Sequence, residues 1–478
     1  MYAGHKPDSR TNGRIIQRNR IMSLMVSISG IRGIVGESLT PEVIVKYVSA
    51  YAEYCNGGKI VIGRDGRITG KIIGNLVSST LLSMGCEVVA LGIAPTPTIQ
   101  IAVEQLGAAG GISITASHNP IEWNGLKFMQ PTGMFLNAEE NKKFWNIAGS
   151  NGRTYARWDK IGKHLADESY LLQHMDMVLH LPFINPETIR KRKFSVVVDC
   201  INSAGGMIVP QLLRSLGCTV TEMNCEVSGV FVRPAEPIPE NLGALCEAVV
   251  HHKADFGIAV DPDVDRLVFI TNEGKPFGEE NTIAAAVKFI LGHPQNLPKD
   301  KRNVVVNLST TRAVEDIARF FGAKVIRTAV GEINVAQKMK EIGAVIGGEG
   351  SGGVILPALH YGRDAIVGIG LILQHLAEFG GTFSEYKDAL PKYFILKEKI
   401  NVGNNDPDKV LAALCEQIEK GGRVNTDDGL KVDYPDSWVH LRKSNTEPII
   451  RIIAEAPTVS KAKELLSQFR TKISDVAT

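Results

Sequence analysis

The chain has 478 residues, of which 44% are hydrophobic and 22% charged, the composition of an ordinary globular protein. With domains of about 100 to 200 residues, this length predicts about three or four domains, each with its own core. The formal net charge of +2 excludes a nucleic-acid or membrane-surface role that depends on bulk charge.

The N-terminal stretch and the cysteines indicate where the protein works. Residues 1–22 are rich in arginine but lack the apolar centre of a secretory signal. We expect a disordered tail or an upstream-extended start, with Met22 or Met25 as the natural start, in preference to a transit segment. The seven cysteines form no CxxC pair and are odd in number, which favours a reducing compartment over a disulfide scaffold. Because no apolar run approaches about 20 residues, the sequence predicts a cytoplasmic protein without a membrane span.

Three stretches of the chain share one pattern. Each begins with an apolar strand that ends in polar residues, continues through a loop and an amphipathic helix, and reaches Gly-x-x-Val at the start of another strand. Continuous apolar strands joined by a helical crossover are typical of a βαβ unit in a sheet covered on both faces. The units run over residues 59–88, 196–220 and 304–325, and Gly85, Gly217 and Gly322 fit the position that follows each helix. The sequence therefore predicts three related α/β domains in series.

The pattern changes after about residue 390. One helical segment is predicted near residues 408–419, alternating strands between 431 and 455, and a last helix from Ser460. This is the pattern of a smaller α+β domain. The predicted domains are 23–165 (domain I), 166–272 (domain II), 273–390 (domain III) and 391–478 (domain IV).

A polar turn in the first domain holds the first candidate for chemistry. Ile114-Thr-Ala-Ser-His-Asn-Pro120 follows a short predicted strand, and Asn119-Pro120 forces the chain to turn. We expect Ser117 to be held at the end of this strand with its hydroxyl exposed. The alternative is that serine, histidine and asparagine are here only as turn formers.

The second domain contributes an acidic loop, Asp261-Pro-Asp-Val-Asp-Arg266. Crowded carboxylates are unfavourable unless a cation neutralises them, and alternate positions of an extended chain point the same way. Carboxylate oxygens suit Mg²⁺. An EF-hand is excluded, because its sixth position would be Arg266 instead of Gly and its twelfth Asn272 instead of Glu. The predicted metal ligands are Asp261, Asp263 and Asp265, and the alternative is a solvated acidic turn.

The third domain contains the glycine-rich loop Gly347-Gly-Glu-Gly-Ser-Gly-Gly353. Such a loop lets the backbone approach a ligand closely, and Glu349 and Ser351 offer an acceptor and a donor for sugar hydroxyls. The sequence contains neither G-x-x-x-x-G-K-[ST] nor a G-x-G-x-x-G that opens a helix in a dinucleotide unit. This argues against ATP and NAD as ligands.

The last domain contains Arg442-Lys-Ser-Asn-Thr-Glu-Pro448 and then Arg451, between two predicted strands. Arginine, lysine, hydroxyls and an amide in one turn suit a phosphate monoester, although a polar hairpin tip is the alternative. Residues 29–33 and 63–67 add further donors that we expect to face the same site.

These four loops, in this order, resemble those of the α-D-phosphohexomutase family, whose members interconvert the 1- and 6-phosphates of glucose, mannose, glucosamine or N-acetylglucosamine. The matching segments run from residue 29 to 455, and Thr-Ala-Ser-His-Asn-Pro together with Asp-x-Asp-x-Asp-Arg is a highly specific combination. The resemblance implies an α/β fold class with three tandem related α/β domains, mixed sheets and a C-terminal α+β domain, arranged around a central cleft.

The resemblance also implies a role for each candidate residue. Ser117 would carry a phosphoryl group and, with Asp261, Asp263 and Asp265, hold Mg²⁺. Sugar hydroxyls would be bound by Glu349 and Ser351, and the phosphate that does not react by Arg442, Ser444, Asn445, Thr446 and Arg451. The transferred group would be surrounded by Arg32, His118, Lys127 and Arg266, with Lys127 or His118 handling the hydroxyl proton.

Three positions depart from the family pattern. Pro262 stands where Gly is usual, and Lys443 where Pro is usual. Gly353 stands where many relatives have His. Two roles are open for His360, seven residues later: it compensates for the missing side chain at position 353, or it is structural.

The predicted function is a phosphohexomutase that works through phosphoserine and a hexose 1,6-bisphosphate, with Mg²⁺ as cofactor and the bisphosphate as activator. Glucosamine phosphate is the favoured substrate, and glucose or mannose phosphate the alternative. The rivals from other classes are a metal-dependent sugar-phosphate phosphatase and a non-catalytic sugar-phosphate sensor. A small-molecule hexose phosphate is the expected partner, without nucleic acid or membrane, and the sequence makes no prediction of oligomeric state.

Overall fold

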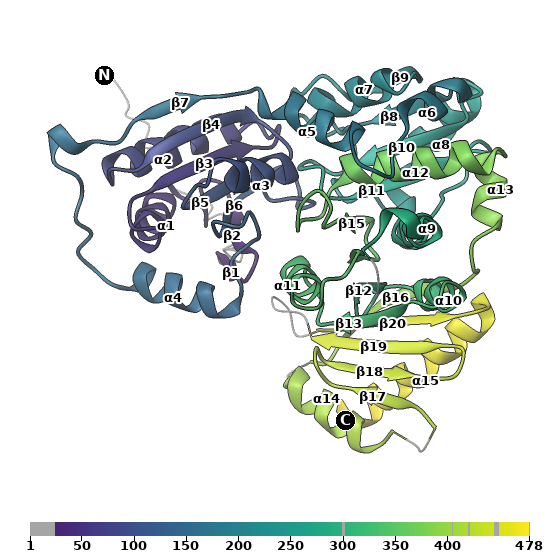
Figure 1. Ribbon diagram of the computed structural model, residues 1–478. Coiled ribbons are helices and arrows are strands. Elements are labelled where there is room, and N and C mark those ends of the chain that lie inside the picture. Colours follow the sequence, from purple (N-terminus) through teal and green to yellow (C-terminus); the bar gives the residue numbers. More distant parts are fainter. Residues whose placement is uncertain (1–23, 299–301, 404, 419–420, 444–448, 478) are drawn as a thin grey trace, which may run out of the picture.

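The computed structural model describes residues 24–298, 302–403, 405–418, 421–443 and 449–477. The prediction about residues 1–22 therefore lies outside the described residues. Figure 1 shows four sheets, each with its own helices, and we name these regions domains I to IV in chain order. Domains I and II lie side by side at the top of the view, domain III below domain II, and domain IV below domain III.

Domain I contains a mixed sheet of order β1-β2-β6-β5-β3-β4-β7. Strand β3 pairs in parallel with β4 and β5. Its alternate side chains face opposite ways: Ile60 and Ile62 pack in one apolar cluster and Val61 in another. The strands are β1 (Met25–Ser27), β2 (Gly30–Ile34), β3 (Lys59–Arg64), β4 (Glu87–Ile93), β5 (Gly110–Ile114), β6 (Trp123–Met129) and β7 (His164–Ala166). The helices are α1 (Pro41–Tyr54), α2 (Gly70–Ser83), α3 (Thr96–Gln105), α4 (Ala138–Gly149) and the short η1 (Trp158–Lys160).

Domain II repeats the βαβ plan with the sheet order β11-β10-β8-β9. Its last strand, β11, runs antiparallel to β10, and the acidic loop connects the two. The strands are β8 (Ser195–Asp199), β9 (Thr219–Met223), β10 (Phe256–Val260) and β11 (Leu267–Thr271). The helices are α5 (Tyr170–Leu179), α6 (Pro186–Arg192), α7 (Gly205–Ser215), η2 (Pro239–Asn241) and α8 (Gly243–His251).

Domain III has the order β13-β12-β14-β15, again with an antiparallel last strand. The strands are β12 (Asn303–Asn307), β13 (Lys324–Thr328), β14 (Ile346–Glu349) and β15 (Gly353–Ile355). The helices are α9 (Glu279–Gly292), η3 (Pro294–Asn296), α10 (Ala313–Phe320), α11 (Glu332–Ile342), α12 (Ala365–Phe379) and α13 (Phe383–Asp388).

The three predicted βαβ units are confirmed as β3-α2-β4, β8-α7-β9 and β12-α10-β13. The glycine predicted to follow each helix has the left-handed backbone that the position requires, with φ of 85° at Gly85, 78° at Gly217 and 67° at Gly322. The predicted fold class, three related α/β domains and a C-terminal α+β domain, is therefore correct.

One apolar cluster joins domains I, II and III, beside a second cluster within domain I and a smaller one within domain II. A single cluster of buried side chains includes Val61 and Ile99 of domain I, Val198 of domain II, and Val305 and Ile369 of domain III. Helix α3 of domain I contacts α5, and α12 of domain III contacts α5 and α6. The three domains are thus held together by apolar packing.

Domain IV has its own core. Its antiparallel sheet, of order β16-β20-β19-β18-β17, packs on α14 and α15, and the apolar cluster between them draws its side chains from domain IV alone. The strands are β16 (Phe394–Asn401), β17 (Arg423–Asn425), β18 (Leu430–Asp433), β19 (Trp438–Lys443) and β20 (Ile449–Ala456), and the helices α14 (Pro407–Glu416) and α15 (Val459–Ala477). The predicted helix near residues 408–419 is α14, and the last helix is α15.

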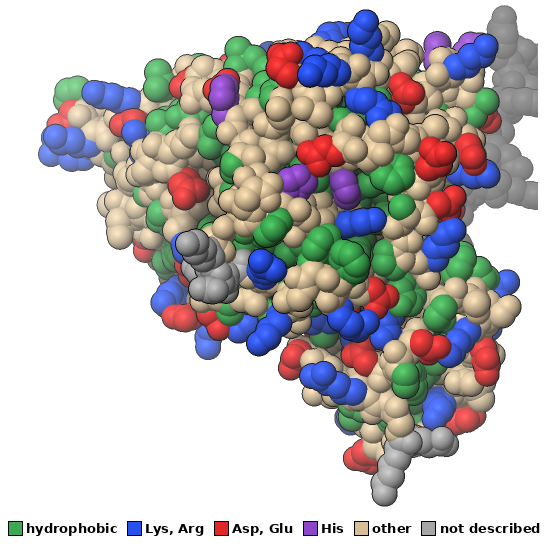
Figure 2. All heavy atoms as spheres, turned by 45° about the vertical axis from the view of Figure 1, so that its right-hand side comes forward, with side chains coloured by type: hydrophobic (Ala, Val, Ile, Leu, Met, Phe, Trp, Pro, Cys, Tyr) green, Lys and Arg blue, Asp and Glu red, His purple; other side chains and the backbone are tan. Residues whose placement is uncertain are grey.

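The surface and the thiols agree with the composition. Figure 2 shows acidic and basic side chains interspersed on the face in view. All seven cysteines lie in the described ranges, and their thiols are free. Within those ranges the structure contains no helix that is both long enough and apolar enough to cross a bilayer.

Candidate active site

Ser117 lies in the turn after β5, where domain I meets domain II. Its backbone has a φ of 48°, and its N–H donates to Thr115 Oγ1 at 2.8 Å. The Ser117 hydroxyl donates to Asp261 Oδ2 at 3.0 Å and lies 3.3 Å from His118 Nδ1. The side chain is only 1% exposed, so the expectation of an exposed hydroxyl is wrong. The acidic loop of domain II covers the end of the strand.

A buried arginine holds this turn in shape. The Arg67 guanidinium donates to four backbone carbonyls between residues 117 and 123, at 2.6 to 2.9 Å. Its Nε donates to Asp65 Oδ2 at 3.1 Å, and Thr115 Oγ1 donates to the same carboxylate oxygen at 2.7 Å. Arg67 is 0% exposed. The expectation that residues 63–67 offer donors to a ligand is therefore wrong for Arg67, because its donors are engaged by the turn.

The three aspartates of the acidic loop converge at the same place. One oxygen from each of Asp261, Asp263 and Asp265 lies within 4.8 Å of the others, and all three residues are buried. The loop is a turn, with a φ of 62° at Val264, and not the extended chain we expected. The left-handed residue turns the carboxylates toward one point.

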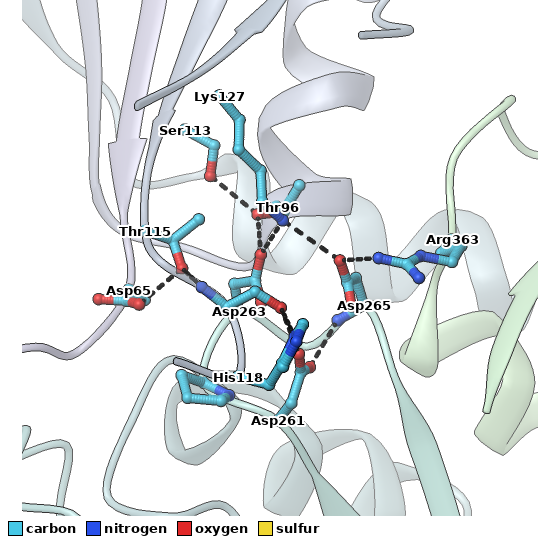
Figure 3. A network of polar contacts seen from close by, with 12 residues as sticks. Asp65, Thr96, Ser113, Thr115, His118, Lys127, Asp261, Asp263, Asp265 and Arg363 are labelled. Carbon is cyan, nitrogen blue, oxygen red and sulfur yellow. Dashed lines mark hydrogen bonds and ion pairs between the residues drawn. The ribbon is translucent and has the colours of Figure 1, made fainter. Parts of the chain in front are cut away.

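Domain I holds the acidic loop through two side chains (Figure 3). Thr96, at the start of α3, donates through Oγ1 to Asp263 Oδ2 at 2.8 Å. Lys127 Nζ, on β6, donates to Asp263 Oδ2 at 2.6 Å and to Asp265 Oδ2 at 3.3 Å. Because these donors engage Oδ2 of Asp263 and Oδ2 of Asp265, they fix which carboxylate oxygens remain for another ligand.

The remaining oxygens fit a metal ion. Asp263 Oδ1 and Asp265 Oδ1 are buried and have no hydrogen-bond partner in the described residues. Burial, and then the charges of Asp265 and Asp263, raise the pKa of Asp261 well above its usual value. Buried, crowded carboxylate oxygens of this kind are the donor set that a hard divalent cation such as Mg²⁺ prefers.

Three further basic groups surround the centre. Arg32 Nη1 donates to Asn119 Oδ1 at 3.2 Å, and Arg266 Nη1 donates to Glu236 Oε1 at 2.9 Å. The positive charge of Arg266, followed by burial and the charge of Arg32, lowers the pKa of His118 well below its usual value. The imidazole of His118 is therefore neutral at physiological pH, and the same positive charges weaken it as a base.

The glycine-rich loop of domain III brings Glu349 to the centre from the other side. Glu349 Oε1 accepts from Asn307 Nδ2 at 2.8 Å and from Gly331 N at 2.9 Å. Glu349 Oε2 accepts from Arg363 Nη1 at 2.7 Å. The carboxylate is 4% exposed, so its position is fixed by three donors, whereas Ser351 lies partly exposed in the turn between β14 and β15.

Arg363 is a residue of the site that the sequence reasoning missed. Its Nη2 donates to Asp265 Oδ2 at 2.7 Å, so one guanidinium joins the acidic loop to the glycine-rich loop. The sequence signal that could have identified Arg363 is an arginine directly before Asp364, at the start of an apolar helix.

The structural alternative for His360 is favoured, because His360 is buried and its Nε2 lies 3.2 Å from Asp364 Oδ2.

In domain IV the structure describes two of the predicted phosphate ligands. Arg442 on β19 and Arg451 on β20 are directly opposite each other across the antiparallel pair. Like charges in this register are destabilising, and Asp428 offsets the repulsion on one side with an ion pair to Arg442 at 2.9 Å. The predicted ligands Ser444, Asn445 and Thr446 lie outside the described residues.

Comparison with protein families matches the chain in four consecutive segments. Residues 24–153, 173–274 and 279–394 match alpha/beta/alpha domains I, II and III of phosphoglucomutase/phosphomannomutase. Residues 399–472 match the C-terminal domain of the same family.

Individual relatives agree over nearly their whole length. The phosphoglucomutase/phosphomannomutase of Thermococcus kodakarensis is 39% identical over 452 residues, which cover 93% of this chain and 97% of the relative. The "probable phosphoglucosamine mutase" of Methanopyrus kandleri is 36% identical over 447 residues, which cover 92% and 96%.

A solved structure shares the fold. The crystal structure of a phosphoglucomutase/phosphomannomutase family protein from Burkholderia thailandensis matches with a TM-score of 0.80 at 24% identity, over 95% of this chain and 98% of that one. The family match extends through all four domains, and the three aspartates cluster beside Ser117. The chain therefore belongs to the α-D-phosphohexomutase family, the isomerases that include phosphoglucomutase, phosphomannomutase and phosphoglucosamine mutase.

Proposed function

We propose that this phosphohexomutase moves a phosphoryl group between the 1- and 6-positions of a hexose, with Ser117 as its carrier and a hexose 1,6-bisphosphate as intermediate. The observation that carries the proposal is the position of the Ser117 hydroxyl, 3.0 Å from a carboxylate of the buried triple-aspartate cluster. A phosphoryl group on this oxygen brings a charge of about −1.5 to −2, and Arg32, Lys127 and Arg266 supply positive charge around it.

Bound Mg²⁺ at Asp261, Asp263 and Asp265 would neutralise charge on the phosphoryl group during transfer. The chain's own residues do the rest. The sugar hydroxyl attacks phosphorus, the bond from phosphorus to Ser117 Oγ breaks, the hydroxyl proton passes to His118 or Lys127, and Ser117 Oγ takes up a proton to become a hydroxyl again. Both acceptors stay open: His118 is neutral but its basicity is weakened by Arg266 and Arg32, and the Lys127 ammonium is engaged by two carboxylates.

The bisphosphate must turn over before the second transfer returns a phosphoryl group to Ser117. We propose that Glu349 and Ser351 bind the sugar hydroxyls in both orientations. Arg442, Ser444, Asn445, Thr446 and Arg451 would bind the phosphate that is not reacting. Since water in the site would hydrolyse the phosphoserine, we also propose that domain IV closes over the ligand.

The favoured substrate is glucosamine phosphate, and glucose or mannose phosphate is the alternative. Several relatives at 33 to 36% identity carry the name probable phosphoglucosamine mutase, although the one at 39% is named phosphoglucomutase/phosphomannomutase. The test compares kcat/KM for the 1-phosphates of glucose, mannose, glucosamine and N-acetylglucosamine, with Mg²⁺ and a hexose 1,6-bisphosphate as primer. A higher value for any sugar other than glucosamine overturns the substrate assignment.

The same assay separates the rival activities. Production of the 6-phosphate isomer supports the mutase, whereas free phosphate without isomer would indicate a phosphatase. Intact mass after priming tests the sensor alternative, since a non-catalytic protein would carry no phosphate on Ser117 and show no turnover. The seven free thiols support a reducing compartment, and we propose the cytoplasm as the site of action.

A further inference from the structure

Arg363 occupies a position between the two binding loops. It is 8% exposed and contacts three acidic side chains. Nη1 donates to Glu349 Oε2 and Nη2 to Asp265 Oδ2, both at 2.7 Å, while Nε lies 3.2 Å from Glu332 Oε2. Figure 3 shows the guanidinium on the side of Asp265 opposite Lys127. Both of its Nη atoms are thus engaged by carboxylates, one from each loop.

Gly353 makes the space for this side chain. A Cβ atom added at Gly353 would lie 2.3 Å from Arg363 Cδ and 2.9 Å from Cγ. The φ of Gly353 is not positive, so the residue is required here for space and not for its backbone conformation. A side chain at position 353 would therefore have to displace the Arg363 side chain.

The backbone at Arg363 is held from several directions. Arg363 N donates to Glu332 Oε1 at 3.0 Å. The next residue, Asp364, caps α12 by accepting from Ile366 N at 2.8 Å and Val367 N at 3.3 Å. Asp364 Oδ2 also lies 2.8 Å from His174 Nε2, a buried side chain of domain II. The guanidinium thus projects from a fixed point, and little freedom is lost when it bridges the two loops.

We propose that Arg363 is a positioning residue that orients the sugar-binding carboxylate of Glu349 and the metal-binding carboxylate of Asp265 through one planar fork. For Glu349 it engages Oε2, while Asn307 and Gly331 engage Oε1. For Asp265 it engages Oδ2 and leaves Oδ1 without a hydrogen-bond partner in the described residues. The sugar half of this inference rests on the proposed function, and the metal half rests on the geometry of the acidic loop alone.

The first test measures the sugar half as a double-mutant cycle. Arg363→Met has no donors, and Glu349→Gln removes the charge that Arg363 holds. Each single variant should lose about 10- to 100-fold in kcat/KM, because a displaced positioning group has effects of this size. If Arg363 acts through Glu349, the double variant should lose no more than about threefold beyond the worse single variant. Losses that multiply would overturn the sugar half.

The second test measures the metal half without turnover. Calorimetric titration with Mg²⁺ alone should give an affinity about 10- to 100-fold weaker for Arg363→Met than for the unchanged chain, the usual loss when a partner of a metal ligand is removed. Unchanged or tighter Mg²⁺ binding by Arg363→Met would overturn the metal half. Tighter binding would mean that the Arg363 guanidinium only competes with the ion for the carboxylates. Arg363→Lys should not restore the wild-type value, because an ammonium lacks the planar fork.

Two controls separate these effects from loss of folding. Arg192→Met removes a half-buried guanidinium that donates to Gly381 O at 3.1 Å, outside the site, and should leave kcat/KM and Mg²⁺ affinity unchanged. Gly353→Ala should lower the melting temperature more in the unchanged chain than in an Arg363→Ala background, because the clash is absent from that background. Equal losses in the two backgrounds would contradict the clash between the two positions. If the unchanged chain shows no mutase turnover, the proposed function fails, while the Mg²⁺ titration still decides the metal half.

Discussion

Replacing Arg67 tests whether the buried guanidinium shapes the Ser117 turn. Arg67→Lys keeps the positive charge but replaces the planar fork by a single ammonium. Arg67 donates to the carbonyls of Ser117, Asn119, Pro120 and Trp123 and to Asp65. An ammonium has three donors, so at least two of these five hydrogen bonds must be lost.

The magnitude follows from the bonds that are lost. A hydrogen bond from a charged donor contributes about 1.5 to 3 kcal/mol, so the loss of two lowers the free energy of unfolding by about 3 to 6 kcal/mol. Arg67→Met should be at least as severe, because breaking a buried ion pair costs about 3 to 5 kcal/mol and Asp65 is fully buried in the turn. Carbonyls without donors would also let the Ser117 hydroxyl move from Asp261, and a displacement of about 1 Å lowers turnover about 100-fold.

The assay combines the melting temperature, kcat for the isomerisation, and the fraction of Ser117 that carries phosphate by intact mass. The matched control is Arg64→Lys. Arg64 lies in the same segment and is half-buried, but within the described residues its guanidinium makes one hydrogen bond, from Nη1 to Asp65 O at 3.2 Å. If Arg67→Lys kept kcat within about threefold of the unchanged chain, with full phosphorylation, the turn would not depend on Arg67.

Three more variants test the chemistry and the electrostatics. Ser117→Ala should abolish isomerisation while calorimetry still detects binding of a hexose 1-phosphate, and normal turnover would sink the carrier role. Asp263→Asn should weaken Mg²⁺ binding by at least about tenfold, because it replaces a charged oxygen ligand by a neutral amide; equal affinity in the two titrations would argue against a metal at this loop. Burial raises the pKa of Glu280, beneath the glycine-rich loop, to about 8. Between about pH 4.5 and pH 8 the unfolded chain loses this proton while the folded chain keeps it, so Glu280 lowers stability as the pH rises, by about 3 kcal/mol at pH 7. The advantage of Glu280→Gln over the unchanged chain in urea unfolding should therefore grow from pH 5 to pH 7.5, and a constant difference would refute the buried-carboxyl explanation.

The sequence was sufficient for features that depend on local pattern. The βαβ units, the glycines that end their helices and the three metal-loop aspartates were all predicted, because strand periodicity, left-handed glycine and crowded charge are properties of short segments. The whole set of loops also matched one family, which gave the fold of the complete chain.

The sequence was insufficient where one domain covers or contacts another. Ser117 was expected to be exposed, but a loop 144 residues later in the chain buries it. Arg67 was expected to face a ligand, but its targets are carbonyls that only the folded turn brings together. Arg363 escaped notice because its partners, Asp265 and Glu349, lie in two other loops. In each case the contact is set by tertiary packing and leaves no periodic signal.

The shared apolar core of the first three domains has a consequence for how the molecule loses structure. Side chains from domains I, II and III belong to one buried cluster, whereas the cluster of domain IV draws on its own sheet and helices. The described links between domains III and IV include polar contacts, such as Ser309 Oγ with His440 Nδ1 at 2.8 Å and Arg312 N with Glu455 Oε1 at 2.9 Å. Because the shared cluster joins domains I, II and III, beside the cluster that domain I has of its own, we predict two cooperative units, one large and one small. Protection from amide hydrogen exchange should vanish together across residues 24–390, and separately in domain IV.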